Sequence, residues 1–504
     1  MRRLSRAAIA AIAGGDVELP RAEMLDLPEK VVQFGTGAFL RGFVDYFIDE
    51  ANRAGRFNGR IVAVSSTGSS REAALSEQGG LYTLAIRGVE AGASREQYRV
   101  VSSISRAISA RDSWSDVLAL ARDPHIELVI SNTTEMGIVL DEGDEFAANP
   151  PRSFPGKLTR FLAERAAAFD YDPRRGVIVL PCELNDENGA RLRVIVRQLS
   201  ERWALDSRFD RWLLDNVLFC NTIVDRIVPG IPRDGESEQF AASLGYRDDL
   251  LTTCEPYAFF GIEGDERLRA RLGFVGVDAR IETTLDIRPY RRRKVRILNG
   301  GHTIVAPVAL LAGLETVRDA CDDERVGRFL RRAIFDEIVP TVDGPGTEQF
   351  ALDVMDRFTN PHIRHALVDI TLYGAAKLRT RVVPSILEYH ARLGRAPASL
   401  AFGFAAYVAF MRGDFHASRA AVGLEMPGDH SGDHLREAWT LVDVESDDAV
   451  ADFVRSVCLD ARLWGADLTK VSGFADAIAE HLVRIARHGI TAALDAHLTE
   501  TAYT

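Results

Sequence analysis

Residues 31–42 read VVQFGTGAFLRG, and this stretch decides the fold. The apolar run that ends at Phe34 predicts a buried strand, and the residues after Gly37 predict a helix. Gly35 and Gly37 occupy the turn, where small residues let backbone amides approach a phosphate at the start of a helix. The third glycine of the usual Gly-x-Gly-x-x-Gly pattern is replaced by Leu40. The motif favours dinucleotide binding, with an ordinary strand-to-helix turn as the alternative.

The turn supplies most of the candidate cofactor-binding residues. We expect Arg41 to add positive charge where the helix N-terminus faces a phosphate. The residues expected to bind cofactor here are Phe34, Gly35, Thr36, Gly37, Ala38, Phe39 and Arg41.

Working outward from this turn, the first half of the chain alternates short apolar runs with amphipathic segments, which is typical of an α/β fold with a mostly parallel sheet. Apolar spacing of three to four residues dominates after about residue 286 and predicts helices. We therefore predict a Rossmann-type domain at 1–286 and a mostly α-helical domain at 287–504. The predicted strands are 31–34, 61–65, 98–104, 127–131 and 176–180, and the predicted helices are 38–52, 113–121, 326–338, 366–378, 400–411 and 474–488.

Composition excludes several classes of protein. A hydrophobic content of 46% in 504 residues is too high for a disordered chain. The net charge of −12 argues against nucleic acid or an anionic membrane as the main partner. Five cysteines without a Cys-x-x-Cys pair indicate neither a disulfide framework nor a zinc site. No apolar run is long enough to span a membrane, and the arginine-flanked start predicts a short helix; we expect a cytoplasmic protein.

Polar residues follow two further predicted strands. The second strand ends in Ser65 and Ser66 without the acid that usually binds the ribose of NAD, and Arg71 follows. This local pattern leans toward NADP. Asn132, Thr133 and Glu135 follow the fourth strand at its carboxyl end, where nucleotide and substrate meet in such sheets. A helix cap is the alternative role for these residues.

A candidate catalytic group lies at the start of the helical half, in RPYRRRKVRILNGGHT at 288–303. In an α-helix, which turns by about 100° per residue, Lys294 and His302 point about 80° apart and Asn299 about 60° from His302. A carbonyl that receives hydride needs a proton donor and fixed hydrogen-bond donors, which these three side chains supply. The alternative is a solvated arginine-rich helix with an incidental histidine.

The sequence resembles the polyol-specific long-chain dehydrogenase/reductase family, which includes mannitol dehydrogenases. The resemblance covers nearly the whole chain after about residue 28 and rests most specifically on the Lys-x4-Asn-x2-His pattern at 294, 299 and 302. It implies that Lys294 is the general acid and base, that Asn299 and His302 polarise the carbonyl, and that NAD is the cofactor. We follow it for the cofactor and leave NADP open. The other matching segments are GTGAFLRG (35–42), SNTTEMGI (131–138), PCELNDENG (181–189) and NTIVDRIVPG (221–230).

Within the family, the sequence looks most like the tagaturonate reductase branch, also called altronate oxidoreductase. Mannitol dehydrogenases usually carry Cys-Asp-Asn where this chain has Cys182-Glu183-Leu184. The resemblance therefore implies a sugar acid as substrate, the keto acid D-tagaturonate, which is reversibly reduced to D-altronate. In RFTNPHIRHALVDITLYGAAKLRTR at 357–381, it implies that a cation pairs with the substrate carboxylate. The candidate substrate-binding residues are Glu183, His365, Lys377 and Arg381.

Three alternatives remain at this point. In the first two, the substrate is fructuronate or mannitol instead of tagaturonate. In the third, the protein binds a dinucleotide without turnover. The intact set of Lys294, Asn299 and His302 argues against this third alternative. The sequence predicts no metal site, because His416, His430 and His434 lie in a stretch typical of a solvated connection between helices. The oligomeric state stays open.

Overall fold

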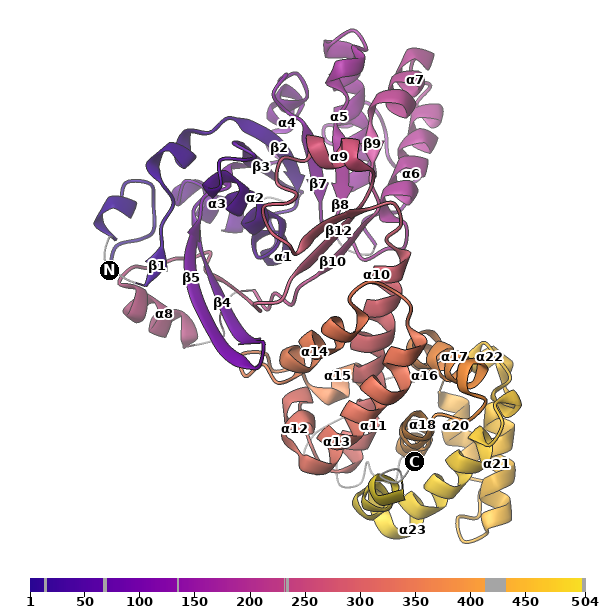
Figure 1. The fold of residues 1–504 in the computed structure, drawn as a ribbon. Coiled ribbons are helices and arrows are strands. Elements are labelled where there is room, and N and C mark those ends of the chain that lie inside the picture. Colours follow the sequence, from indigo (N-terminus) through magenta and orange to yellow (C-terminus); the bar gives the residue numbers. More distant parts are fainter. Residues whose placement is uncertain are drawn as a thin grey trace. The chain divides into compact units, whose positions relative to one another are not determined.

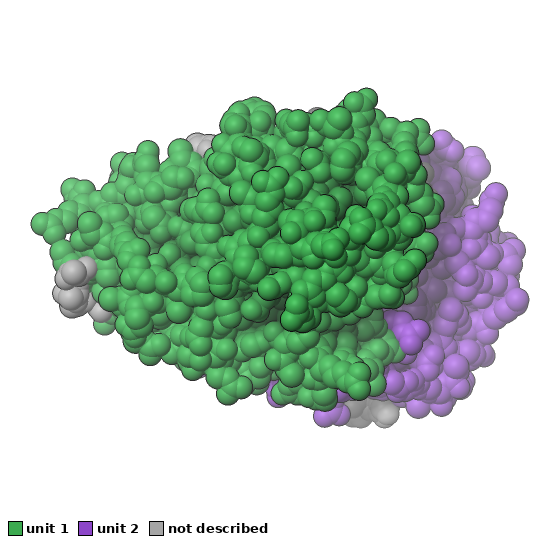
Figure 2. Space-filling view, turned by 90° about the horizontal axis from the view of Figure 1, so that it is seen from above, with its two compact units in different colours: residues 1–88, 94–287 green, residues 89–93, 288–504 purple. Residues whose placement is uncertain are grey.

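The computed structural model describes residues 1–12, 16–66, 70–133, 136–230, 232, 235–412 and 432–500. They form two compact units, which are coloured separately in Figure 2. The first comprises residues 1–88 and 94–287, and the second comprises residues 89–93 and 288–504. Glu135, His416, His430 and most of the predicted connection between helices lie outside the described residues.

The first unit is built on a six-stranded sheet in which every neighbouring pair is parallel (Figure 1). This arrangement confirms the predicted α/β class. Chain order reverses between β2 and β7, and a crevice for ligands forms at such a point, outside the carboxyl ends of the strands. The strands in spatial order are β6 (Ile104–Ser109), β3 (Arg60–Ser65), β2 (Glu29–Phe34), β7 (Leu128–Ser131), β8 (Ile178–Pro181) and β9 (Leu218–Phe219).

Helices cover both faces of this sheet, which explains why its strands are apolar throughout. Val32 and Val129 face one core and pack with helices α4–α7, whereas Val31 and Ile130 face the other core and pack with α2. The helices of this unit are α1 (Ala38–Arg41), α2 (Val44–Arg53), α3 (Ser70–Glu77), α4 (Trp114–Ala121), α5 (Phe154–Ala168), α6 (Asn188–Arg202), α7 (Ser207–Asn216), α8 (Glu236–Leu244) and α9 (Glu266–Arg271).

Two smaller sheets complete the first unit. One has the order β1 (Val17–Glu18), β5 (Ala93–Val101), β4 (Tyr82–Glu90) and β11 (Thr252–Cys254). The other has the order β10 (Thr222–Asp225), β12 (Phe259–Glu263) and β13 (Ile281–Thr284).

Three sequence predictions in this unit are wrong. The expected strand 98–104 is split between β5 and β6 of different sheets, because Ser102 and Ser103 turn inward and bond to Asp49 and to the backbone of Asp45. The expected helix 38–52 is broken at Gly42, where a Cβ would lie 2.8 Å from Val228. The expected N-terminal helix is a 3-10 turn at Ile9–Ala11.

The second unit is helical, as expected, with α18 at its centre (Figure 1). Residues 399–411 of this helix are all buried, and they pack against α11 and α23. The helices are α10 (Arg288–Arg293), α11 (Gly300–Leu311), α12 (Val317–Asp322), α13 (Glu324–Arg332), α14 (Thr347–Phe358), α15 (Leu367–Thr371), α16 (Gly374–Lys377), α17 (Val383–Leu393), α18 (Ala398–Met411), α20 (Asp433–Trp439), α21 (Asp447–Leu459), α22 (Ala461–Trp464) and α23 (Phe474–Glu500).

Three π-helical turns interrupt this unit: η4 (Lys294–Asn299), η5 (Ala333–Ile338) and η7 (Leu378–Val382). Because of η5, the predicted helix 326–338 is α-helical only to Arg332. The predicted helix 366–378 divides at Tyr373, whose φ of 54° is left-handed. Among the residues that the structure describes, no helix combines the length and apolarity needed to cross a bilayer.

Candidate functional site

The turn after β2 is shaped by the backbone of a neighbouring loop. Gly35 has a φ of +133°, and a Cβ at this position would lie 2.9 Å from the carbonyl oxygen of Asn132. Its amide donates to the carbonyl of Val64 at 2.9 Å. A Cβ on Gly37 would meet nothing within 4 Å, so this residue borders open space. Glycine is required at 35 by backbone contact, and Gly37 leaves room for a phosphate to approach the turn.

The loop after β7 is fixed by Glu183, which follows β8. The Glu183 side chain is only 2% exposed, and its carboxylate accepts from the Ser131 hydroxyl and from the Thr133 amide and hydroxyl, each at 3.0 Å. Burial raises the pKa of Glu183. Asn132 donates from its side chain to the carbonyl of Cys182 at 2.7 Å. Glu183, which we predicted to bind substrate, therefore stabilises the loop after β7. This loop carries Asn132 and Thr133, which we predicted to bind cofactor.

Arg41 has a structural task that the sequence did not predict. It is 1% exposed, and its guanidinium donates to the carbonyl of Thr36 at 2.6 Å and to the hydroxyl of Thr252 at 3.1 Å. This cation supports the turn from within. Phe34 is likewise buried against Phe154, and its carbonyl accepts from the amide of Asn132 at 3.1 Å.

The end of β3 contains an acid that sequence reasoning missed. Ser66 is exposed there, and the hydroxyl of Ser65 donates to the carboxylate of Glu72, which lies in α3. No acidic residue directly follows the strand in the sequence, so the local pattern does not reveal this acid. Glu72 lies seven residues after Ser65 in the sequence, and helix α3 places its carboxylate against the end of the strand. An acid in this position could accept a hydrogen bond from a ribose hydroxyl.

In the second unit, Lys294 and Asn299 are the first and last residues of the π turn η4, and His302 follows in α11. The sequence analysis assumed an α-helix throughout this segment, which is wrong for 294–299. A π turn bonds residue i to residue i+5, so it stacks residues five apart above each other. Lys294 and Asn299 therefore lie on one face, and both are half-buried.

His302 is the most enclosed member of the predicted catalytic group. It is 8% exposed, its ring lies 4.1 Å from that of Phe358, and neither ring nitrogen bonds to another described residue. Burial lowers the pKa of His302 well below its ordinary value, and the neighbouring His365, Arg357, Arg381 and Lys377 lower it further. The lowered pKa favours the neutral ring, in which one nitrogen carries an N–H that can donate to a ligand.

The same electrostatic neighbours form a positive environment around this ring. Lys377 donates to the carbonyl of Ile370 at 2.9 Å, and Arg381 donates to the hydroxyl of Thr303 at 3.3 Å. Arg357 is 5% exposed at the end of α14. Sequence reasoning missed Arg357 and Phe358, although both begin the segment RFTNPHIRH in which it placed His365.

Two glycines bring the π turns together. A Cβ on Gly300 would lie 3.1 Å from the carbonyl of Arg381 in η7, and one on Gly301 would lie 3.0 Å from Ile334 in η5. The hydroxyl of Thr303 donates to the carbonyl of Asn299 at 2.7 Å and accepts from Arg381. The structure thus brings Asn299, His302 and Arg381 together, with His365 against the ring of His302.

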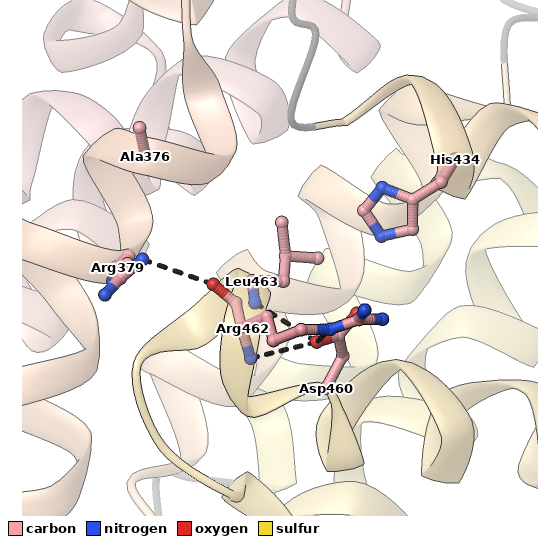
Figure 3. A pocket seen from close by; sticks show the side chains of 6 residues that line it. All are labelled: Ala376, Arg379, His434, Asp460, Arg462 and Leu463. Atoms are coloured by element: carbon pink, nitrogen blue, oxygen red, sulfur yellow. Dashed lines mark hydrogen bonds and ion pairs between the residues drawn. The ribbon is translucent and has the colours of Figure 1, made fainter.

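A separate pocket of about 470 Å³ lies beside η7 (Figure 3). Arg379 of η7 donates to the carbonyl of Arg462 at 3.2 Å, and Asp460 caps α22 beside it. None of the predicted site residues lines this pocket, whose lining is Ala376, Arg379, His434, Asp460, Arg462 and Leu463.

Comparisons with known proteins agree with both units. Residues 29–274 match the model of the mannitol dehydrogenase Rossmann domain, and residues 286–486 match that of the mannitol dehydrogenase C-terminal domain. The chain is therefore an oxidoreductase. It belongs to the mannitol dehydrogenase family, which confirms the resemblance seen in the sequence.

Curated relatives are similar over nearly the whole chain. Altronate oxidoreductase of Yersinia pestis is 42% identical over 474 residues, which cover 93% of this chain and 97% of that protein. Altronate oxidoreductase of Bacillus subtilis is 40% identical over 468 residues and covers 93% and 95%.

Two solved structures share the fold. Mannitol 2-dehydrogenase of Pseudomonas fluorescens, in a ternary complex with NAD and D-mannitol, has a TM-score of 0.69 at 21% identity and covers 99% of both chains. D-sorbitol dehydrogenase in substrate-free form has a TM-score of 0.77 at 22% identity and covers 98% of this chain and 100% of that one.

Proposed function

We propose that the chain interconverts D-tagaturonate and D-altronate with NAD as the redox partner and Lys294 as the acid and base. The observation that carries the proposal is the buried, neutral His302 with unbonded ring nitrogens among three cations. A neutral hydrogen-bond donor suits a carbonyl oxygen, and surrounding cations suit a substrate with a carboxylate. The altronate oxidoreductases similar to this chain carry the same substrate class in their name.

The chemistry of the substrate oxygen falls to the second unit. During reduction, negative charge develops on this oxygen, and donors that are fixed in advance stabilise it. Asn299 donates from its amide and His302 from its ring N–H, while Lys294 gives the proton that completes the hydroxyl. In the reverse direction, neutral Lys294 takes this proton from the alcohol.

The substrate carboxylate is assigned to Arg381 and Lys377. A planar guanidinium binds a carboxylate through two parallel hydrogen bonds, so Arg381 sets its orientation. Lys377, in the neighbouring helix α16, adds a second positive charge. A neutral polyol such as mannitol has no carboxylate for these two cations to bind, which makes mannitol the weaker candidate.

The cofactor is assigned to the first unit. The residues fit a dinucleotide, because the backbone contact at Gly35 and the open space at Gly37 form a turn that a Cβ would fill. The nicotinamide, when bound, would supply the hydride as NADH or accept it as NAD⁺. Glu72 accepts from the ribose hydroxyl in our proposal, which favours NAD over NADP because a 2′-phosphate would meet its carboxylate.

The test is a panel of tagaturonate, fructuronate and fructose assayed with NADH and NADPH. We expect the highest kcat/KM with tagaturonate and NADH. A higher value with fructuronate or fructose overturns the substrate assignment, and a preference for NADPH overturns the cofactor assignment.

The role of Lys294 is tested separately. Lys294→Ala removes the proton donor, for which we expect a loss of kcat of about 100-fold to 10,000-fold. Binding of NADH should not change, because no cofactor contact is assigned to this residue. Unchanged turnover in a folded variant contradicts the assignment.

A further inference from the structure

A buried pair of side chains lies directly beneath the cofactor turn. Gln33 of β2 and Asp45 of α2 are both fully buried. The amide nitrogen of Gln33 donates to the carbonyl of Gly35 at 3.1 Å and to Oδ2 of Asp45 at 3.4 Å. Gln33 therefore connects the carboxyl group of Asp45 to the backbone of the turn.

The orientation of the Gln33 amide is determined by its neighbours. The carbonyl of Gly35 can only accept, so Nε2 must face it. This leaves Oε1 of Gln33 and Oδ1 of Asp45, and neither atom has a hydrogen-bond partner among the described residues. These two oxygen atoms belong to adjoining buried side chains, and a single hydrogen-bond donor between them would satisfy both.

We propose that a proton on Oδ1 of Asp45 is this donor, and that the acid–amide pair it forms with Gln33 is a positioning device for cofactor binding. The proton bonds to Oε1 of Gln33, while Nε2 of Gln33 bonds to Oδ2 in return. The ring so closed fixes the Gln33 amide and, through it, the carbonyl of Gly35. The proposal rests on the first unit being the cofactor-binding unit, as proposed above.

The electrostatic surroundings favour the neutral acid. Burial raises the pKa of Asp45 to about 7, although the hydrogen bond from Gln33 and the charge of Arg41 lower it. Asp45 is not the ion-pair partner of Arg41, whose guanidinium donates to Thr36 and Thr252. Loss of the proton would leave Oδ1 of Asp45 and Oε1 of Gln33 as two buried acceptors without a donor, which is unfavourable in free energy.

Several other titratable and charged groups surround Asp45, and the Asp45→Asn variant separates its titration from theirs. Burial raises the pKa of Tyr82 and of Cys182 well above their ordinary values. Asp49, one turn along α2, accepts from Ser102 and pairs with Arg53. Asp248 is held by Gln78 and Leu250, and burial raises its pKa. The only histidine before residue 288 is His125, which is exposed.

The consequence is a pH-dependent affinity for the cofactor. The protonated pair holds the turn, so the dissociation constant of NADH should be lowest below the pKa of Asp45. As pH rises through about 7, the constant should increase, by at most about tenfold per pH unit for a single proton. NADH is the proper probe, because the 2′-phosphate of NADPH itself titrates near neutrality.

The experiment measures NADH binding by fluorescence from about pH 6 to about pH 9. Asp45→Asn keeps the shape of the neutral acid, so we expect wild-type affinity at the low end and a constant affinity throughout. Gln33→Met should bind NADH more weakly at every pH. Asp49→Asn, a buried acid of the same helix, is the matched control and should keep the wild-type pH profile.

Infrared difference spectroscopy on the cofactor-free enzyme supplies an independent readout. We expect a carboxylic acid band at low pH that disappears on titration and is absent from Asp45→Asn. A missing band, or a flat wild-type NADH profile, overturns the proposal. So does a loss of affinity of Asp45→Asn at low pH, since an ionised Asp45 would then be required. If wild type fails to bind NADH at all, the cofactor assignment falls as well.

Discussion

The imidazole ring of His302 packs against that of His365, with centroids 4.7 Å apart and an interplanar angle of 73°. Burial lowers the pKa of both histidines, and the charge of Lys377 lowers both further. These shifts favour the uncharged form of both rings, and Arg357 and Arg381 add to the effect at His302.

From this arrangement we expect His302 to stay unprotonated as the pH falls from 7 through 6.5, the ordinary pKa of histidine, and somewhat below. Protonation of His302 should therefore cause no loss of kcat/KM in this range. His302→Ala removes a fixed donor to the developing oxyanion and should lower kcat about 100-fold to 1,000-fold. A pH–rate profile of wild type and variant checks both points. An acid limb near 6.5 that vanishes in the variant would contradict a neutral, buried His302.

Arg381 should determine preference for an acid over a neutral substrate. Arg381→Met removes a charged hydrogen bond of about 2–3 kcal/mol, so kcat/KM for the hexuronate should fall about 30-fold to 160-fold. Turnover of a neutral ketose should change little. The matched control is Arg379→Met in the same π turn, whose side chain lines the separate pocket and should leave kcat/KM unchanged. Equal losses on both substrates would assign Arg381 to support of Thr303 instead.

Glu72 should determine preference for NADH over NADPH. Glu72→Gln keeps the side-chain size but removes the charge that would repel a 2′-phosphate. We expect the ratio of kcat/KM for NADH over NADPH to drop about tenfold. Glu77→Gln, at the end of the same helix, pairs with Arg3 and serves as the control. An unchanged ratio in Glu72→Gln would place the ribose away from this acid.

Stability should depend on pH through a buried cluster in the second unit. His481 and His497 pack on Phe402, and burial lowers their pKa to about 4 and about 3. The unfolded chain binds these protons near pH 6.5 and the folded chain does not. The stabilisation is therefore complete above about 6.5 and is lost as pH falls toward 3. The contribution is about 3 kcal/mol for His481 and about 5 kcal/mol for His497.

Glu337 acts in the opposite sense in the same cluster. Its carboxyl group accepts from the amides of Ser399 and Leu400 at 2.7 and 2.8 Å, and burial raises its pKa to about 7. Its stabilising effect is present below about 4.5 and is lost as pH rises through 7. Urea unfolding should thus show maximal stability near pH 6, with Glu337→Gln flattening the alkaline side and His497→Phe the acid side. A profile that neither variant changes would contradict these assignments.

The sequence predicted a mostly parallel sheet covered by helices, since buried strands leave a local apolar pattern. Apolar runs ending at Phe34, Ser65 and Ser131 fall on observed strands because these strands are buried on both faces. Lys294, Asn299 and His302 stand out in the sequence because their spacing within one segment is short, and their catalytic role stays a prediction.

What the sequence could not show depends on contacts across long separations. Arg41 was expected at a phosphate, but Thr252 lies 211 positions away and only the fold brings it to the guanidinium. Glu183 bonds to residues 50 to 52 positions earlier for the same reason. The π turn at 294–299 has an ordinary helical pattern, and close packing of Gly300 on Arg381 is visible only in three dimensions.

The π turn at Lys294–Asn299 also bears on how this enzyme should be compared with distant relatives. Such a turn is an α-helix that has gained one residue, so it can be erased by a single deletion without breaking the helix. In a relative with one residue fewer between the lysine and the asparagine, both residues would be present, but their side chains would point to different sides of the helix. Alignments of this segment should therefore be judged by spacing before residue identity, because the spacing decides which side chains share a face of the helix.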